Sequence, residues 1–153
     1  MEVSPWPYVF DFVKTVCIGI AGWTAVVFLI SRMGWAGFAR RYATAVQPAA
    51  RGFRARHASF GFPLAGYNNV VYVTFTPEGI YARATFPFNA GHRPLLLPWQ
   101  SLASAEIRRT FLFNGLAVKL LTDAGRLTLT LPVQAQPALE AARPKPDAAL
   151  STF

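Results

Sequence analysis

The chain has 153 residues, of which 53% are hydrophobic and only 14% are charged. Soluble globular domains usually carry about 25% charged residues, so this composition excludes a disordered chain and favours a membrane segment. Lys and Arg number 15 against 7 Asp and Glu, which gives a formal net charge of +8. Such an excess predicts anionic partners: phospholipid headgroups, nucleic acid or acidic protein surfaces. The length allows one small domain with an appendage.

An apolar run over residues 12–30 follows a short flank, residues 1–11, that contains Trp6 and Tyr8. Lys14 is the only charged residue in the run. As a helix the run is roughly 28 Å long, which matches the hydrocarbon thickness of a bilayer. The sequence therefore predicts one transmembrane helix over residues 12–30, with Trp6 and Tyr8 at the membrane interface.

The residues on either side of the run favour an uncleaved anchor over a signal peptide. A signal peptide has a basic region before the run and a small-residue cleavage site after it, whereas here Glu2 and Asp11 precede the run. The residues after the run are strongly basic, and the positive-inside rule places them in the cytoplasm. We therefore expect a bacterial inner-membrane protein with residues 1–11 in the periplasm and the remainder in the cytoplasm. The basic residues are Arg32, Arg40, Arg41, Arg51, Arg54 and Arg56.

One face of the predicted helix carries small residues. Such a face lets another helix approach closely, which drives helix association in lipid, and Lys14 lies at the outer end of the same face. The alternative is chance, because Gly and Ala are common in transmembrane helices. The predicted packing face consists of Ile18, Ala21, Gly22, Ala25 and Leu29.

Residues 31–46 have the periodicity of an amphipathic helix, and Gln47-Pro48 ends it, leaving a linker to residue 50. An aromatic face beside arginines suits a helix in the headgroup region. In the alternative, the aromatic residues pack on the domain that follows. The predicted membrane-interface residues are Trp35, Phe38 and Tyr42 with Arg32, Arg40 and Arg41.

From residue 51 to residue 142 the period of apolar residues changes from helical to two. This alternation predicts an antiparallel β-barrel or sandwich of about six or seven strands, and so an α+β protein. Turns are predicted at 76–79, at Asn114-Gly115 and at 123–125. A short helix is expected within 133–142, followed by a loose tail at 143–153. The predicted strands cover 53–60, 71–75, 80–86, 95–98, 105–113, 116–122 and 127–131.

Several segments also carry a family resemblance. The chain resembles small bacterial single-pass membrane proteins of uncharacterised function, whose β-rich domain is similar to pleckstrin-homology-like (PH-like) or GRAM-like modules. The resemblance covers roughly residues 34–131 and implies a fold type and a membrane address, without a reaction or binding residues. The segments are Gly34-Trp35 with Ala39 and Tyr42, Tyr67-Asn-Asn-Val70, Glu78-Gly-Ile-Tyr81, Phe86-Pro-Phe88 and Gly91-His-Arg-Pro-Leu-Leu-Leu-Pro-Trp99.

The residue types that carry catalysis are sparse and scattered. Cys17 lies in the apolar run, where burial removes thiol reactivity. His57 and His92 have arginine neighbours and no Asp, Glu or Cys at the spacing of metal ligands. The seven acidic residues form no pair suited to acid–base chemistry. We therefore expect no catalytic residues, no metal, no cofactor and no enzymatic activity.

Two groups of residues are candidates for binding an anionic partner. The first group is Arg51, Arg54 and Arg56. The positive-inside rule alone would account for Arg32, Arg40 and Arg41, but the first group lies further from the predicted transmembrane helix. The loop over residues 86–94 offers an apolar tip, Phe88, with the donors His92 and Arg93. In the alternative, the phenylalanines of this loop fold back into the core.

These features predict a non-enzymatic accessory subunit of a larger integral membrane complex, for example a respiratory or photosynthetic one. The helix would anchor the subunit, and the cytoplasmic β-domain would support the surface of the complex. The alternative is a membrane-tethered PH-like module that binds anionic phospholipid headgroups, through Arg51, Arg54, Arg56 and Arg83 or Arg93, or a signalling partner. Nucleic acid is not expected as a partner, because a tether beside the basic segment directs its charge at lipid first.

Overall fold

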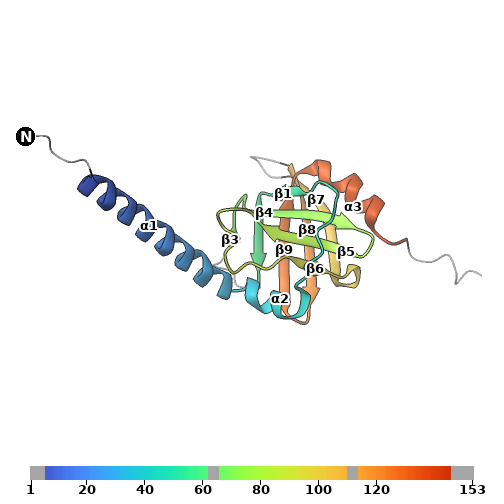
Figure 1. The fold of residues 1–153 in the computed structure, drawn as a ribbon. Helices are drawn as coiled ribbons and strands as arrows, with labels where there is room; N and C mark the ends of the chain where they lie inside the picture. The colour runs from blue at the N-terminus through green and yellow to red at the C-terminus, as the bar shows by residue number, and fades with distance from the viewer. Residues whose placement is uncertain (1–5, 62–65, 110–113, 146–153) are drawn as a thin grey trace, which may run out of the picture.

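A 27-residue helix, α1 (Trp6–Arg32), projects from a β-rich domain (Figure 1). The computed structural model describes residues 6–61, 66–109 and 114–145. Within these ranges α1 is the one helix long and apolar enough to cross a bilayer. It begins six residues before the predicted run, so Trp6 and Tyr8 are helical rather than part of an irregular flank. Only Val27 and Ser31 of α1 are buried.

The second helix, α2 (Trp35–Tyr42), is shorter than the predicted helix over residues 31–46. It is separated from α1 by a break at Gly34, where φ is +155°. The helix ends at Tyr42 because Ala43 is extended and pairs with Leu95. Val46, the last residue of the predicted helix, therefore lies beyond α2 with 74% of its surface exposed.

The strands of the described residues form two antiparallel sheets, not a closed barrel. The barrel form of the PH-like prediction is therefore wrong, and two sheets form the β-domain. The first sheet has the order β1-β4-β5-β6, with strands β1 (Phe53–Ala55), β4 (Val71–Thr76), β5 (Gly79–Ala84) and β6 (Leu95–Leu97). The second has the order β3-β2-β9-β8-β7, with strands β3 (Gly66–Tyr67), β2 (His57–Phe60), β9 (Gly125–Leu131), β8 (Asn114–Thr122) and β7 (Leu102–Arg109).

Three strand predictions need correction. Residues 53–60 form two strands, because the chain passes from one sheet to the other at Arg56. Strand β5 ends at Ala84, two residues before the predicted end at residue 86. Asn114 and Gly115 are not a turn, because they pair with Arg109 and Arg108 inside the β7–β8 ladder. The connection and residues 110–113 of the predicted strand 105–113 lie outside the described residues.

The core lies between the two sheets and extends under α2. Alternate residues of β4, β5, β8 and β9 point inward, as the two-residue period predicts. Trp35 and Phe38 of α2 join the same cluster, packed on Phe60. The predicted turns at 76–79 and 123–125 are present between β4 and β5 and between β8 and β9. Burial of one face of each sheet is thus the main source of stability.

The end of the described chain agrees with the predicted short helix. A single turn of 3₁₀ helix, η2 (Val133–Ala135), leads into α3 (Gln136–Ala142), and Leu139 anchors α3 in the core. Another 3₁₀ turn, η1 (Trp99–Ser101), leads from β6 into β7. Of the predicted tail, residues 143–145 are irregular and residues 146–153 are outside the described part.

Candidate functional site

The loop between β5 and β6 packs against the last third of α1. The Trp23 indole Nε1–H donates to the carbonyl of Pro87 at 3.4 Å, and its ring meets that of Phe88 edge-on at 5.3 Å. Gly91 (φ +74°) touches Ser31 so closely that a Cβ there would lie 2.6 Å from the serine Oγ. Phe88 therefore packs on α1, rather than in the core or at a free tip. These contacts couple α1 to the domain over two and a half turns.

Two buried polar side chains, His92 of this loop and Tyr67 of β3, contact each other near α1. His92 Nδ1–H donates to the Ala90 carbonyl at 2.9 Å, and His92 Nε2 lies 3.1 Å from the Tyr67 hydroxyl. The Tyr67 hydroxyl also lies 3.4 Å from the Ile30 carbonyl in the last turn of α1. Burial lowers the pKa of His92 and raises the pKa of Tyr67 to about 12. Both side chains are therefore neutral at pH 7 and connect α1 to the domain.

Three predicted contact residues lie inside the protein. Trp35 and Phe38 are fully buried, so their side chains do not reach a membrane interface. Packing on the domain, the alternative prediction, is what the structure shows. The Trp35 indole packs on Phe60, with 4.4 Å between the ring centroids, and its Nε1–H donates to the Arg93 carbonyl at 2.8 Å. His92 is 4% exposed and is unavailable as a surface donor. The sequence pattern identifies an apolar face of α2, but not the surface that covers it.

The buried His92 predicts a pH dependence of stability. The unfolded chain protonates His92 below about pH 6.5, whereas the folded protein resists protonation because its pKa is lower. Folding stability should therefore be constant above about pH 7 and fall as the pH decreases below 6.5. Urea unfolding of the full chain in mild detergent, between pH 5.5 and 8, measures this dependence.

The substitution His92→Gln should remove that pH dependence while retaining a polar partner for Tyr67. His57→Gln is the matched control, because His57 is exposed and its Nδ1 lies 2.9 Å from the Asn68 side-chain oxygen. It should leave the slope between pH 5.5 and 6.5 unchanged. An equal slope in wild type and His92→Gln would contradict the burial of a neutral imidazole.

Three arginines from separate segments converge beside the junction of α1 and α2. Arg32 ends α1, Arg40 lies on α2 and Arg93 lies in the loop between β5 and β6. Together with Ala36, Ala39 and Gly91 they line a pocket of about 340 Å³. Arg32 also lies over the Phe28 ring, with its Cζ 5.5 Å from the centroid. Among the described residues, no Asp or Glu lines this pocket. We call it the junction pocket; its positive potential suits a phosphate or carboxylate group.

Arg41 has a different environment, although it is adjacent to Arg40. Its guanidinium forms an ion pair with Asp123 in the β8–β9 turn, and the Tyr42 hydroxyl donates to the same carboxylate. The hydrogen bond from Tyr42 and the charge of Arg41 lower the pKa of Asp123. Arg41 and Tyr42 therefore tether α2 to the domain.

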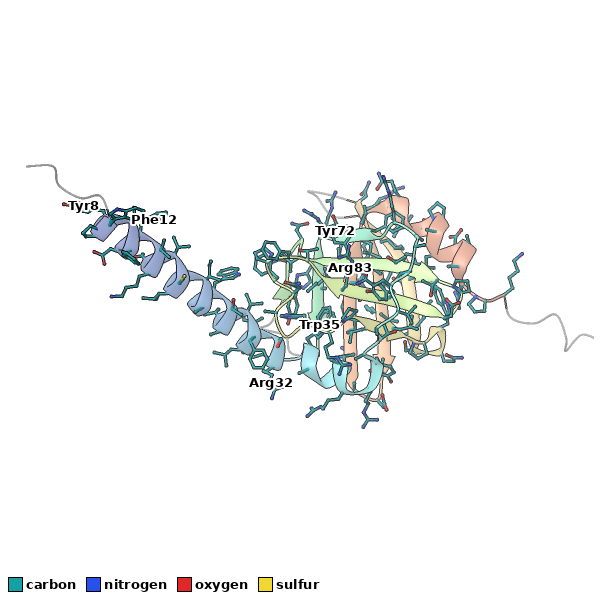
Figure 2. The ribbon with its side chains drawn as sticks, in the orientation of Figure 1. Tyr8, Phe12, Arg32, Trp35, Tyr72 and Arg83 are labelled. Carbon is teal, nitrogen blue, oxygen red and sulfur yellow. The ribbon has the colours of Figure 1, made fainter. Side chains whose placement is uncertain are left out.

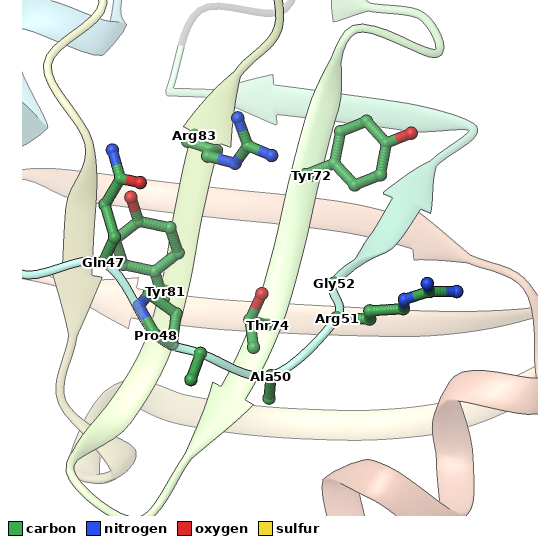
Figure 3. Close-up of a pocket in the computed structure, with 10 residues that line it drawn as sticks. Gln47, Pro48, Ala50, Arg51, Gly52, Tyr72, Thr74, Tyr81 and Arg83 are labelled. Carbon is green, nitrogen blue, oxygen red and sulfur yellow. The ribbon is translucent and has the colours of Figure 1, made fainter.

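A second basic cluster covers the outer face of the first sheet (Figure 3). Arg54, Tyr72 and Arg83 are aligned across β1, β4 and β5. Figure 3 shows Tyr72 and Arg83 on the neighbouring strands β4 and β5. The Cζ atoms of Arg54 and Arg83 lie 5.2 and 5.4 Å from the Tyr72 ring centroid, and Arg54 also donates to the Tyr72 hydroxyl at 3.1 Å. Cation–π contact thus positions both guanidinium groups. Figure 3 shows the Arg51 side chain directed away from this row.

A pocket of about 390 Å³ adjoins this row, between the sheet and residues 47–52. Tyr81 lines it, and its buried hydroxyl has no hydrogen-bond partner within the described structure. Burial raises the pKa of Tyr81, while Arg83 opposes that shift. Tyr72 and Tyr81 were not among the predicted site residues. In the sequence, these tyrosines only occupy alternate positions of predicted strands, as Arg83 does. That pattern does not distinguish the ligand-binding face of a sheet from a face that contacts only solvent.

The remaining predicted residues are dispersed. Arg51 and Arg54 lie on the outer face of the first sheet, and Arg56 lies at the passage between the sheets, where it lines a separate pocket with His57 and Asn68. The structure therefore does not unite Arg51, Arg54 and Arg56 in one site. It unites Arg93 with Arg32 and Arg40 instead.

The small-residue face of α1 points away from the β-domain. At 3.6 residues per turn, Ala21, Gly22 and Ala25 lie roughly opposite Trp23 and Val27, which face the domain. Gly22 has no neighbouring side chain within 4 Å of its Cβ position. The rest of the predicted packing face, Ile18 and Leu29, is likewise exposed.

Among the described residues, no group of three or more His, Cys, Asp or Glu side chains is placed to hold a metal ion. Comparison with protein-family models, with curated proteins and with solved structures gives no match for this chain. The geometry of the junction pocket and of the Arg54–Tyr72–Arg83 row is therefore the basis for the function proposed below.

Proposed function

We propose that this protein is a non-enzymatic, single-pass membrane protein whose β-domain binds anionic phospholipid headgroups beside its own helix. The observation that carries this proposal is the junction pocket, in which Arg32, Arg40 and Arg93 gather at one end of an apolar helix. Figure 2 shows Arg32 at the domain end of α1, with Tyr8 and Phe12 at the far end. A helix that crosses the bilayer places the domain end of α1 among lipid phosphates.

Charge at this position has a direct energetic consequence. Each basic residue near an anionic membrane surface contributes about 1 kcal/mol. Three arginines with no acid among the pocket residues therefore favour an anionic over a zwitterionic lipid by about 3 kcal/mol, roughly 100-fold in affinity. The Arg54–Tyr72–Arg83 row adds positive charge on the outer face of the first sheet.

Native mass spectrometry of the full chain in mild detergent tests the proposal. We expect phosphatidylglycerol to be retained in preference to phosphatidylcholine. The triple substitution Arg32→Gln, Arg40→Gln, Arg93→Gln should lower the affinity for phosphatidylglycerol by about two orders of magnitude.

The matched control removes the same charge elsewhere, with Arg108→Gln, Arg109→Gln and Arg126→Gln on β7 and β9. These arginines are exposed and line no part of the junction pocket. The control should retain preference for the anionic lipid. Equal losses in both variants would mean that net charge, rather than the junction pocket, selects the lipid. Recovery of a chain that lacks residues 1–30 from the aqueous fraction would overturn the anchor itself.

A second candidate function is that of an accessory subunit of a larger integral membrane complex. The specific observation in its favour is the exposed small-residue face of α1, which lies opposite the domain contact and is open to another helix. The coupling of α1 to the domain through Trp23, Phe88 and Gly91 would then hold the β-domain against that complex.

Migration in a native gel after mild solubilisation tests this candidate. The wild-type chain should migrate with a large complex, and Gly22→Leu should release it by blocking close helix approach. Gly19→Leu is the matched control, because Gly19 lies on α1 outside the small-residue face and also has no neighbour within 4 Å. Migration of the wild-type chain alone would contradict the accessory-subunit role.

A further inference from the structure

The tip of the loop between β5 and β6 is apolar and exposed. Phe86 has 86% of its surface exposed, although Ala84, two residues earlier, is buried in the first sheet. Pro87 is exposed beside it, while Phe88 is held against Trp23 of α1. The domain therefore presents an aromatic ring and a proline that its own core does not use, and it holds them next to α1.

The position of this tip along α1 is set by its contacts. Phe88 and Pro87 meet Trp23, whereas Gly91 meets Phe28 and Ser31, closer to the end of the helix. Nine residues separate Trp23 from Arg32, a rise of about 13 Å along the axis. A headgroup layer is only about 5–8 Å thick. With Arg32 among the phosphates, the tip reaches the edge of the hydrocarbon.

We propose that Phe86 and Pro87 insert into the bilayer beside α1, as a second membrane contact that sets the orientation of the β-domain. This inference rests on the proposed function, because it requires α1 to cross the membrane. The occupant is lipid acyl chain, since the apolar surface of the tip continues into exposed Trp23 and Phe28 on α1. The junction pocket on the other side of Gly91 then lies at the level of the phosphates.

Insertion of the loop tip would give the exposed Phe86 and Pro87 a role in orienting the β-domain. Two contacts, a helix and a loop tip, restrict the rotation of a domain that a single helix would leave free to turn. The Arg54–Tyr72–Arg83 row ends near the same loop, since Arg83 lies on β5 three residues before Phe86. Insertion of the tip therefore brings the positive row toward the membrane surface.

Site-directed spin labelling of the full chain in vesicles of phosphatidylcholine and phosphatidylglycerol tests this inference. In a Cys17→Ser background, Phe86→Cys and Glu78→Cys are labelled separately, and collisions with oxygen and with a water-soluble nickel chelate are compared. Glu78 is the matched control, because it is exposed in the turn at the opposite end of the β4–β5 hairpin. Cys17 labelled in the wild-type chain reports whether α1 lies in the bilayer.

We expect the label at residue 86 to collide with oxygen and to be protected from nickel, as at Cys17, while the label at residue 78 shows the reverse. Protection at Cys17 with nickel access at residue 86 equal to that at residue 78 would overturn the inference alone. Nickel access at Cys17 as well would overturn the membrane-spanning helix and the inference together.

A second pair of variants tests the Phe86 side chain with the spin label at a different residue of the loop. With a label at Asn89→Cys, which is exposed in the same loop, Phe86→Ser should raise nickel access at residue 89 several-fold, whereas Phe86→Leu should not. Equal nickel access in the two variants would contradict insertion of the residue 86 side chain.

Discussion

Trp35→Ala should destabilise the β-domain by about 3–5 kcal/mol, the range for truncation of a buried aromatic side chain. Trp35 is fully buried, its ring contacts Phe60, Tyr67 and His92, and its indole Nε1–H donates to the Arg93 carbonyl. The substitution leaves a cavity where α2, the loop and the second sheet meet. Because domains are stable by only about 5–15 kcal/mol, this loss is a large fraction of the free energy of unfolding. Pulse proteolysis of the full chain in urea and mild detergent measures the effect.

The same experiment compares a core residue with a residue that was predicted to lie at a membrane interface. Trp6→Ala is the matched control, because Trp6 lies at the start of α1 with 66% of its surface exposed. It should leave the urea midpoint of the β-domain unchanged. A loss below about 1 kcal/mol for Trp35→Ala would contradict the packing of α2 into the core, because surface substitutions have effects of that size.

Gly34→Ala should destabilise the protein by about 2–4 kcal/mol, from backbone strain and steric overlap together. Gly34 has φ +155°, a conformation that L residues rarely adopt, and it forms the break between α1 and α2. A Cβ at this position would lie 2.4 Å from the Phe60 carbonyl oxygen. The chain would have to shift α2 away from the second sheet. Urea unfolding in mild detergent, followed by intrinsic tryptophan fluorescence, measures the change in the free energy of unfolding.

Gly37→Ala is the matched control for this position. Gly37 lies inside α2 with nothing within 4 Å of its Cβ position. Alanine favours a helix interior over glycine, so the control should stabilise the protein by about 0.5–1 kcal/mol. The opposite signs expected at residues 34 and 37 depend on geometry alone, since the chemical change is the same. Equal changes in the free energy of unfolding for Gly34→Ala and Gly37→Ala would contradict the backbone conformation of Gly34 between α1 and α2.

Local sequence patterns were sufficient to predict the elements that depend on a single local property, such as hydrophobicity or turn-forming residues. The apolar run predicted α1 because nineteen residues with a single charge among them match the length of a bilayer span, although the helix extends further, to Trp6. Two-residue alternation predicted most strands, and the turns at 76–79 and 123–125 followed from their Pro, Gly and Asp residues. These features are set by residues close in sequence, so no tertiary information was needed.

The positions of Asn114-Gly115 and of the strand over residues 53–60 depended on pairing with distant strands. Asn114 is held in β8 by its ladder partner Arg109, so a dipeptide that favours turns lies inside a strand. Residues 53–55 pair with β4 and residues 57–60 with β9, which divides one apolar pattern between two sheets. Tertiary pairing overrides local propensity here because each ladder satisfies several backbone groups at once.

The sequence by itself determined an apolar helix followed by a basic, β-rich domain with no recognisable catalytic grouping. Only the tertiary structure decided that Trp35, Phe38 and His92 are interior, and that Arg32, Arg40 and Arg93 share one pocket. The reason is physical: an apolar face is visible in the periodicity of a helix, but what covers that face depends on surfaces brought together from far along the chain. Arg93 and Arg32 are 61 positions apart in the sequence and meet because the loop docks on α1.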